Sequence, residues 1–150
     1  MSKRIISVIG GRQCNYEVEQ IAQELGKKLS KVVGYLACGG LSGTMKAVCA
    51  GFKAGGGVTI GILPGYDKKD ANEFVDIPLP TGMGLARNVL VVKVAEAVIA
   101  LPGEAGTLSE IAYCLQFGIP VVCLNSWDIP GVIKAKTVDE AIEKVKELIK

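Results

Sequence analysis

The chain has 150 residues, a formal net charge of +2, no histidine and five cysteines. A chain of this length is expected to form one domain, covering residues 1–150, with a core that needs no disulfide or metal. Nearly balanced charge without a basic block argues against nucleic acid as a partner. The absence of histidine removes the commonest general base and metal ligand, so we predict no metal site.

The cysteine pattern and the amino terminus indicate the compartment. The cysteines are odd in number and contain no C-x-x-C pair, which favours a reducing environment over a disulfide scaffold. The apolar run that follows the basic residues 1–4 breaks at Gly10 and is too short for a signal peptide or a membrane span. We therefore expect a soluble, cytoplasmic protein with no membrane partner.

Apolar runs and helical periodicity alternate along the chain. Residues 4–9 are β-branched and apolar, which indicates a buried strand, and residues 16–29 place apolar side chains at helical spacing. The other predicted strands are residues 32–37, 58–63, 77–79, 97–101 and 119–124, and the other predicted helices are residues 43–54, 85–95, 107–117 and 138–150. This alternation predicts an α/β fold, a three-layer, doubly wound and mostly parallel sheet of the Rossmann type.

Three glycine-rich turns each follow an apolar run and precede a helical segment. Glycine lets an anion approach the backbone amides, and the following helix adds unpaired N–H groups and the positive end of its dipole. In doubly wound folds the ligand lies beyond the carboxyl ends of the strands. We therefore predict one anion site formed by Gly10 and Gly11; by Gly39, Gly40, Ser42, Gly43 and Thr44; and by Gly103, Gly106 and Thr107.

Each of these turns also has a purely structural interpretation. The third turn is equally consistent with an ordinary strand-to-helix connection, in which Thr107 caps the helix and Glu110 is solvated. The second turn is equally consistent with a tight loop packed against the sheet. The sequence leaves both alternatives open.

The segment 81–88 follows another predicted strand and adds Gly82, Met83 and Arg87 to the predicted site. An arginine near a helix start is unfavourable with the helix dipole unless an anion compensates it. We therefore predict that Arg87 clamps a phosphate or carboxylate, and the alternative is a surface arginine in an ion pair. Arg12, just after the first strand, would face the same crevice, although a solvated loop charge is the favoured interpretation.

Cys38 adjoins the second glycine turn. A helix amino terminus at this point would lower the pKa of the Cys38 thiol and make it reactive. Cysteine is, however, among the residue types most often buried, so a small packing residue is the favoured interpretation.

Four segments carry a family resemblance: residues 39–45, 62–65, 80–88 and 102–110. They resemble, in content and order, the Rossmann-type superfamily of the "Lonely guy" (LOG) cytokinin-activating phosphoribohydrolases, which also carries the label lysine decarboxylase-like. Within it the chain resembles the molybdenum-cofactor-carrier-like branch, related to the DprA/Smf proteins. The resemblance implies a nucleotide-binding or phosphate-binding Rossmann domain.

The hydrolase branch of this superfamily cleaves the N-glycosidic bond of nucleoside 5′-monophosphates. Its P-G-G-x-G-T-x-x-E motif is matched from Pro102 to Glu110, except that Glu104 replaces the second glycine. Arg87 matches the family's arginine, and Asn88 stands where a lysine is expected. If the protein is a hydrolase, the resemblance implies that Arg87 holds the sugar phosphate and Glu110 activates water or stabilises an oxocarbenium-like transition state.

Three hypotheses follow. The leading one is a cytoplasmic binding protein for a nucleotide or a phosphorylated pterin-type cofactor; the alternatives are a nucleoside 5′-monophosphate N-glycosidase and a ligand-free structural or interaction homologue, which Glu104 favours. The resemblance also implies a homo-oligomer, a dimer or dimer of dimers, for which helices 85–95 and 107–117 are the candidate interface.

Overall fold

Seven parallel strands form the centre of the computed structural model, which describes residues 3–150; Met1 and Ser2 of the basic amino terminus lie outside the described residues. The strand order is β4-β3-β2-β1-β5-β6-β7, and every neighbouring pair is parallel. The strands are β1 (Ile5–Ile9), β2 (Tyr35–Cys38), β3 (Val58–Leu63), β4 (Ile77–Pro80), β5 (Ala97–Ala100), β6 (Val121–Leu124) and β7 (Ile133–Ala135). The predicted doubly wound α/β sheet is confirmed.

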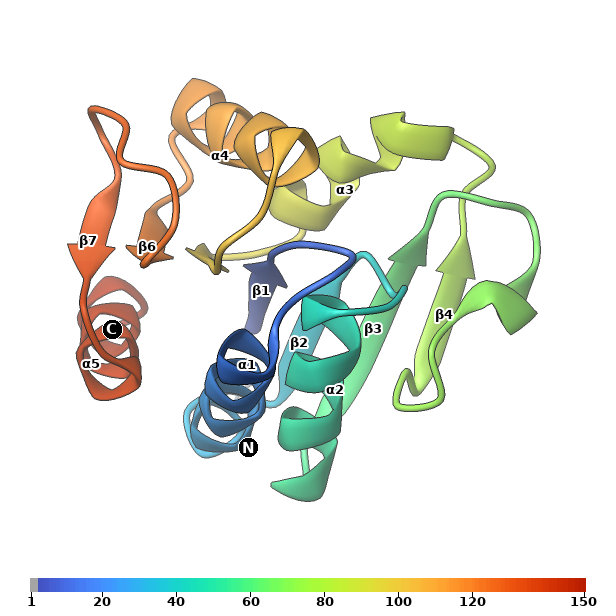
Figure 1. The fold of residues 1–150 in the computed structure, drawn as a ribbon, viewed down its shortest axis with the longest axis horizontal. Coiled ribbons are helices and arrows are strands. Elements are labelled where there is room, and N and C mark those ends of the chain that lie inside the picture. The colour runs from blue at the N-terminus through green and yellow to red at the C-terminus, as the bar shows by residue number, and fades with distance from the viewer. Residues whose placement is uncertain (1–2) are drawn as a thin grey trace.

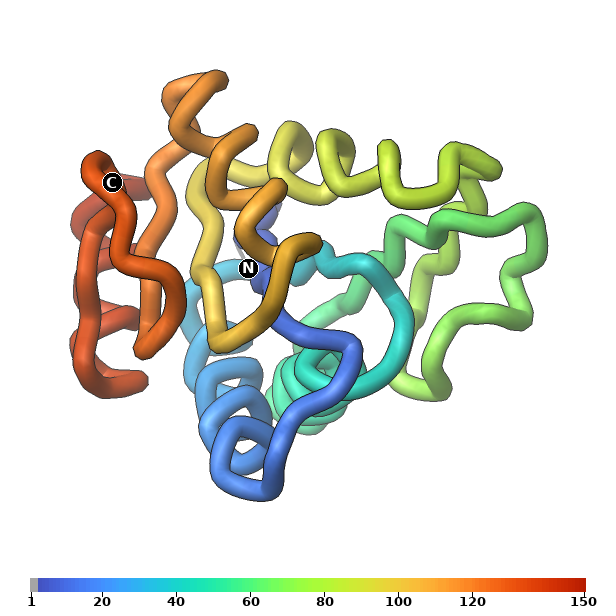
Figure 2. The backbone as a smooth tube through the Cα atoms, turned by 45° about the horizontal axis from the view of Figure 1, so that its top comes forward, coloured from blue at the N-terminus to red at the C-terminus, as the bar shows by residue number. Residues whose placement is uncertain are grey.

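Helices cover both faces of this sheet (Figure 1). One face carries α1 (Tyr16–Leu29), α2 (Thr44–Ala54) and α5 (Val138–Leu148), and the other carries α3 (Asn88–Lys93) and α4 (Ala105–Phe117). The helices α1 and α2 lie side by side, as do α3 and α4 (Figure 2). Two apolar clusters fill the layers, one around Phe52 and Leu25 under α1 and α2, the other around Val91 and Ile111 under α3 and α4.

The helix ends show why some helices need no help from other loops. The side chain of Asn15 accepts a hydrogen bond from the Val18 amide at the start of α1, and Thr137 does the same for Glu140 at the start of α5. The helices α2 and α4 have Gly43 and Glu104 at their N-cap positions, and neither has a side-chain cap. Their first amides must therefore find partners elsewhere or remain open.

Several predicted boundaries differ from the structure, and three of them bear on the site. The strand predicted at 32–37 begins only at Tyr35, because the Val32 and Val33 amides still bond to the Leu29 carbonyl after α1. The helix predicted at 85–95 is split into a 3-10 turn, η2 (Gly84–Arg87), and α3. The helix predicted at 107–117 begins two residues earlier, at Ala105.

Two short elements complete the fold. The polar segment 66–76, which lies between β3 and β4, contains one 3-10 turn, η1 (Lys68–Asp70). The edge strand β7 was not predicted, because three residues with a single large apolar side chain give no periodicity. None of the described helices is long and apolar enough to cross a bilayer.

The order of the strands reverses between β1 and β5, which is the switch point of the sheet. The loops that leave these two strands diverge toward opposite faces. They remain in contact at their start, where the Gly11 amide donates to the Pro102 carbonyl at 3.1 Å.

Candidate anion-binding pocket

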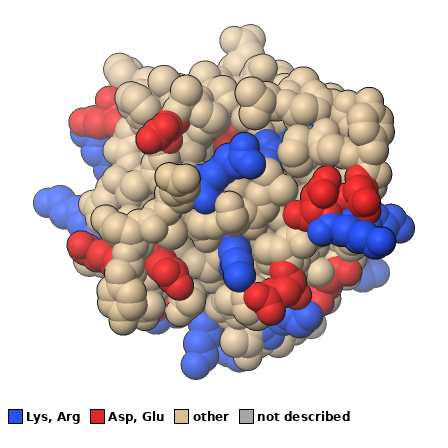
Figure 3. Space-filling view, turned by 45° about the vertical axis from the view of Figure 1, so that its right-hand side comes forward, with Lys and Arg blue, Asp and Glu red and all other residues tan. Residues whose placement is uncertain are grey.

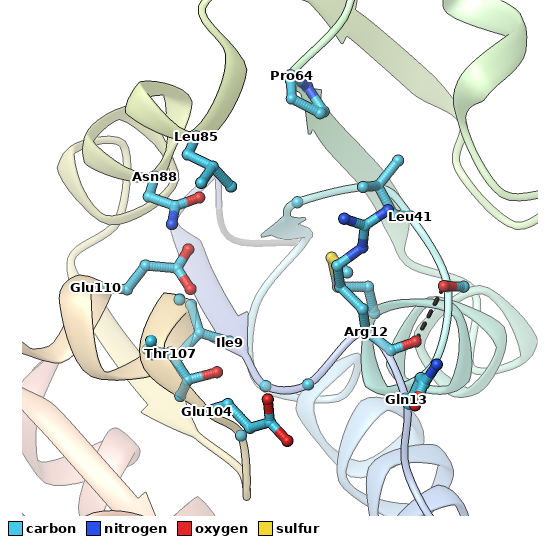
Figure 4. A pocket seen from close by; sticks show the side chains of 18 of the residues that line it. Ile9, Arg12, Gln13, Leu41, Pro64, Leu85, Asn88, Glu104, Thr107 and Glu110 are labelled. Carbon is cyan, nitrogen blue, oxygen red and sulfur yellow. Dashed lines mark hydrogen bonds between the residues drawn. The ribbon is translucent and has the colours of Figure 1, made fainter.

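A pocket of about 640 Å³ opens at the switch point, beyond the carboxyl ends of β1, β2, β3 and β5. This volume lies in the range of small-molecule sites. Figure 4 shows Glu110, Asn88 and Leu85 on one side of the pocket and Arg12 and Leu41 on the opposite side. Of the predicted site residues, the lining contains Gly10, Gly11, Gly39, Ser42, Arg87, Gly103, Gly106, Thr107 and Glu110.

The remaining predicted site residues, Gly40, Gly43, Thr44, Gly82 and Met83, lie outside this lining. Gly43 and Thr44 pack beneath the turn that follows β1, and the buried Thr44 hydroxyl has no hydrogen-bond partner among the described residues. Gly82 is covered by the Tyr66 ring, which lies where a Cβ atom would be placed.

The first turn of α4 brings backbone amides without partners to the pocket. The Leu108 amide is the first to bond within the helix, to the Glu104 carbonyl, so the amides of Ala105, Gly106 and Thr107 have no acceptor in the described part of the chain. They line the pocket together with the positive end of the helix dipole. The purely structural interpretation, in which Thr107 caps the helix, is wrong on this point, because α4 begins two residues before Thr107.

Gly103 shows how tightly this turn is built. A Cβ atom at this position would lie 2.0 Å from the Thr107 hydroxyl oxygen, so no larger residue fits here. The Trp127 indole N–H donates to the Gly103 carbonyl at 3.1 Å and holds the turn from outside. The turn is therefore held firmly at the wall of the pocket.

Three amides of the other two glycine turns are used internally. The Gly11 amide bonds to Pro102, the Thr44 amide donates to the Gly11 carbonyl at 3.0 Å, and the Gly40 amide donates to the Cys38 sulfur at 3.3 Å. These three amides are not available to a ligand. Their hydrogen bonds hold the first and second turns against their neighbours.

Arg87 is buried, with 6% of its surface exposed, at the end of η2. Its Nε donates to the Ile62 carbonyl at 2.8 Å, Nη2 reaches the Gly39 carbonyl at 3.4 Å, and Nη1 donates to the Asn88 side-chain oxygen. Burial lowers the pKa of Arg87 from its usual value. The alternative of a surface arginine in an ion pair is therefore wrong.

Arg12 is exposed, as expected for a loop residue, but it also lines the pocket. Its backbone carbonyl accepts a hydrogen bond from the Ser42 hydroxyl at 3.0 Å, which ties the first loop to the second (Figure 4). The Arg12 guanidinium also contributes to the lowered pKa of Arg87. Two guanidinium groups thus repel each other across one pocket.

Glu110 is 7% exposed and reaches the pocket from the second turn of α4 (Figure 4). Burial raises the pKa of Glu110 to about 8, although the nearby Arg87 charge acts in the opposite direction. Its carboxyl is therefore mostly un-ionised at neutral pH. Among residues 3–150, no hydrogen bond reaches this carboxyl.

Asn88 joins the two helices on this side of the pocket. Its side-chain nitrogen donates to the Ser109 hydroxyl at 3.3 Å, and its oxygen accepts from Arg87. Asn88 therefore holds Arg87 and α4 in place. Glu104, the other departure from the hydrolase motif, is exposed at the lower edge of the pocket in Figure 4.

Cys38 is fully buried, as the favoured interpretation predicts, and does not line the pocket. Its sulfur lies 3.4 Å from the Cys49 sulfur. This contact lowers the pKa of Cys38 and raises the pKa of Cys49. All five cysteines are free thiols.

For Arg12, the sequence analysis favoured a solvated loop charge over a place in the shared crevice, and the structure shows an exposed residue that also lines the pocket. The signal was its place directly after Gly10 and Gly11 at the end of the first strand. The apolar lining residues Leu41, Pro64 and Leu85 were missed, because apolar loop residues carry no chemical pattern. On the face drawn in Figure 3, acidic and basic side chains are interspersed without a continuous basic stripe.

Together these features define a Rossmann-like protein with a positively charged pocket at its switch point. The chain belongs to the SLOG cluster4 family, whose model matches residues 3–149. A protein of Archaeoglobus fulgidus is 41% identical over 140 residues, 93% of this chain and 89% of its own. A probable cytokinin riboside 5′-monophosphate phosphoribohydrolase of Oryza sativa subsp. japonica is 34% identical over 113 residues, 69% of this chain and 50% of its own.

The solved structures confirm the resemblance to molybdenum-cofactor carriers. The molybdenum cofactor binding protein of Rippkaea orientalis superposes with a TM-score of 0.93 at 34% identity, covering 100% of this chain and 99% of its own. The molybdenum cofactor carrier protein of Chlamydomonas reinhardtii superposes with a TM-score of 0.89 at 34% identity, and the match covers 98% of this chain and 99% of its own. DNA processing protein A of Helicobacter pylori superposes with a TM-score of 0.73 at 16% identity, and the match covers 97% of this chain and 81% of its own. At that identity the likeness shows a shared fold alone.

Proposed function

We propose that the protein binds a small phosphorylated ligand, and that a pterin-type cofactor is the ligand best supported. One observation carries this proposal: Arg12 and Arg87 face one pocket together with the open amides of α4, while the buried acid Glu110 is mostly un-ionised. Facing guanidinium groups repel each other unless an anion lies between them. The pocket therefore carries an excess of positive charge that a phosphate would neutralise.

The lining also suits a ring attached to the phosphate. The α4 turn offers amides and the Thr107 hydroxyl for the phosphate, and Leu41, Pro64 and Leu85 offer apolar surface for a flat heterocycle. A bound phosphorylated pterin would use both ends of the pocket. The structural relatives named for the molybdenum cofactor are consistent with this ligand class.

The first experiment is native mass spectrometry of freshly purified protein, which reports the mass of any ligand retained. It is followed by calorimetric titration with the phosphate ester of 6-hydroxymethylpterin, with the unphosphorylated pterin, and with adenosine 5′-monophosphate. We expect saturable binding of the two phosphate esters and at least about tenfold weaker binding of the unphosphorylated pterin. Binding of none of them would support the ligand-free alternative that the exposed Glu104 favours.

A matched pair of surface variants localises the binding. Arg12→Gln removes one guanidinium from the pocket, and Lys69→Gln removes an exposed charge on η1, outside the lining. We expect Arg12→Gln to weaken phosphate binding about tenfold or more, since hydrogen bonds to charged groups contribute about 1.5–3 kcal/mol. Equal affinities of the two variants would contradict the assignment of the pocket.

A second candidate function is phosphoribohydrolase activity. It is favoured by the presence of Arg87 and Glu110 in the same pocket, the pair that the rice relative's enzyme class would use. An un-ionised Glu110 is suited to protonating the leaving base while water adds to the sugar carbon. Chromatographic detection of free base from nucleoside 5′-monophosphates tests this. Activity that persists in Glu110→Gln would refute the role.

We also propose self-association through the α3–α4 face. Tyr113 and Phe117 stack there at 5.9 Å between ring centroids, and Lys93 lies 4.6 Å from the Phe117 ring. Val94, Tyr113 and Phe117 are each 36–40% exposed. Solution scattering over a concentration series, repeated with Tyr113→Glu, tests for a dimer that this charge disrupts.

A further inference from the structure

Glu110 is the one acidic residue that is buried among residues 3–150. Buried carboxyl groups are normally paired with a cation or satisfied by hydrogen bonds. Glu110 has no hydrogen-bond partner in the described chain, although it lines a pocket wide enough for a ligand. The Glu110 carboxyl is thus unpartnered, belongs to a residue that is more than nine-tenths buried, and lies in the same pocket as the first residues of α4.

The titratable and charged groups that interact with Glu110 lie on η2, on β2 and on α4 itself. Arg87 approaches from η2 and favours the ionised form, whereas Cys38 at the end of β2 and Cys114 on α4 interact with the same carboxyl. Arg12 and the exposed Glu104 line the same pocket from its mouth. The Arg87 guanidinium donates its hydrogen bonds to the Ile62 and Gly39 carbonyls, and it does not form an ion pair that would neutralise Glu110.

We propose that the pocket binds its ligand together with a proton on Glu110, so that affinity is high when this carboxyl is un-ionised and falls when it ionises. This inference rests on the proposed binding of a phosphorylated ligand at the same site. An ionised Glu110 would place a negative charge beside a phosphate in a poorly solvated pocket. The un-ionised acid removes that repulsion and can donate a hydrogen bond to the ligand.

The charge balance names the ligand class. With Glu110 un-ionised, the charged groups of the lining are Arg87, Arg12 at the mouth and the exposed Glu104, which leaves an excess of one positive charge, and the start of α4 adds the helix dipole. The two guanidinium groups can each face one charge of a phosphate monoester dianion. The pocket should therefore prefer dianionic esters over monoanions of similar size, such as the corresponding carboxylates.

The direction of the pH dependence follows from linkage. In the ligand-free protein the pKa of Glu110 is about 8, and a bound dianion raises it further, so binding takes up protons near this pH. Adenosine 5′-monophosphate is a suitable probe because its second phosphate pKa is near 6, and it is already a dianion at pH 8. Affinity should be nearly constant close to pH 7, where the probe is mostly a dianion and Glu110 is mostly un-ionised, and its fall should approach tenfold per pH unit above pH 8.

The experiment is calorimetric titration with adenosine 5′-monophosphate at pH 8 in two buffers of different ionisation enthalpy, repeated across pH 7 to 9.5. Wild type should take up about half a proton per ligand at pH 8 and lose about 30-fold in affinity over this range. Glu110→Gln should take up none, and its affinity should change less than about threefold between these pH values. This variant keeps the size and the hydrogen-bonding capacity of the un-ionised acid.

Two control variants exclude other titrating groups. Glu104→Gln removes the exposed carboxylate of the same pocket, and we expect tighter binding at every pH with the pH dependence retained. Cys38→Ser removes the neighbouring thiol, whose pKa is lowered, and should also retain it. The proton count on wild type needs no variant and is independent of how any variant folds.

The outcomes separate the two proposals. Binding without proton uptake at pH 8, or a pH dependence that persists in Glu110→Gln, overturns the coupling while the proposed function stands. Loss of the pH dependence in Cys38→Ser overturns it in favour of the thiol. No binding of the phosphate ester at any pH overturns the proposed function and the coupling together.

Discussion

Two glycine turns of this protein differ in how tightly they are tied to neighbouring loops. The turn after β5 leaves the amides of Ala105, Gly106 and Thr107 without an acceptor among the described residues. The turn after β2 is tied to its neighbours at both ends, since its Gly40 and Thr44 amides bond to Cys38 and Gly11. A glycine-rich turn before a helix therefore marks a close approach of the backbone, and the partner in that approach is either a ligand or another loop.

The steric environment of the glycines shows the same contrast. A Cβ atom on Gly43 would lie 2.4 Å from the Arg12 carbonyl group, with a φ of 66°. On Gly106 the nearest atom to such a Cβ, the Asn88 side-chain nitrogen, lies 3.9 Å away, across the pocket wall. Gly43 is therefore required by the fold itself, whereas a glycine at position 106 is required only if a ligand occupies the pocket beside it.

The largest expected effect comes from Gly43→Ala. The left-handed backbone and the overlap with the Arg12 backbone should together destabilise the protein by about 3–5 kcal/mol. Urea denaturation measures this as a lower midpoint. A loss below about 1 kcal/mol would show that the second turn is looser than its hydrogen bonds indicate.

The next effect concerns the buried acid of the third turn. A carboxyl whose folded pKa is raised to about 8 binds its proton more tightly in the folded than in the unfolded chain, so it lowers stability progressively as pH rises from about 4.5 to 8. Glu110→Gln removes this loss. We expect the variant's thermal midpoint, relative to wild type, to rise by roughly 5–8 °C between pH 5 and pH 8.5, on the order of 2–3 kcal/mol.

The same comparison at pH 5 serves as the internal control, because Glu110 is un-ionised there in the folded protein. Any difference between the variants at pH 5 reports the exchange of an acid for an amide. A midpoint difference that is identical at both pH values would show that Glu110 does not titrate in this range.

The sharpest contrast to Gly43→Ala is Gly106→Ala. The added methyl group fits without overlap and removes a flexible glycine from the first turn of α4, so stability should stay equal or rise by about 0.5–1 kcal/mol. The methyl group projects toward Asn88 at the pocket, and adenosine 5′-monophosphate affinity should fall about tenfold. Titration calorimetry and urea denaturation on one preparation separate the two effects. Unchanged affinity would place the phosphate away from α4.

Sequence periodicity was sufficient for the fold because each long element repeats its apolar residues over several turns or alternations. The helix at Tyr16–Leu29 and the strand at Ile5–Ile9 are examples. The strand β7 could not be predicted from the sequence, because Ile133–Ala135 has no strand pattern of its own and becomes a strand by pairing with β6. The break between η2 and α3 likewise depends on tertiary contacts of Arg87 with Ile62 and Gly39.

The site was only partly predictable for a related reason. The residue types in the three turns identify where backbone amides can be exposed, but the partners of Gly11 and Thr44 lie in other loops. The raised pKa of Glu110 arises from burial beneath segments that are distant in sequence. These loops and side chains come together only at the edge of the folded sheet, so their contacts could not be predicted from the sequence.

The smallest expected effect tests whether the second turn reaches the ligand only through Arg12. Ser42→Ala removes the hydroxyl that donates to the Arg12 carbonyl at 3.0 Å, an exposed hydrogen bond that contributes about 0.5 kcal/mol to stability. Freed from this contact, the Arg12 loop should hold its guanidinium less firmly, and adenosine 5′-monophosphate affinity should fall about twofold to threefold. In an Arg12→Gln background the same substitution should change affinity by less than about 1.5-fold, because the charge it positions is gone. Additive losses in the double variant would mean that the second turn binds the ligand directly, and the contrast between the two turns would be one of degree.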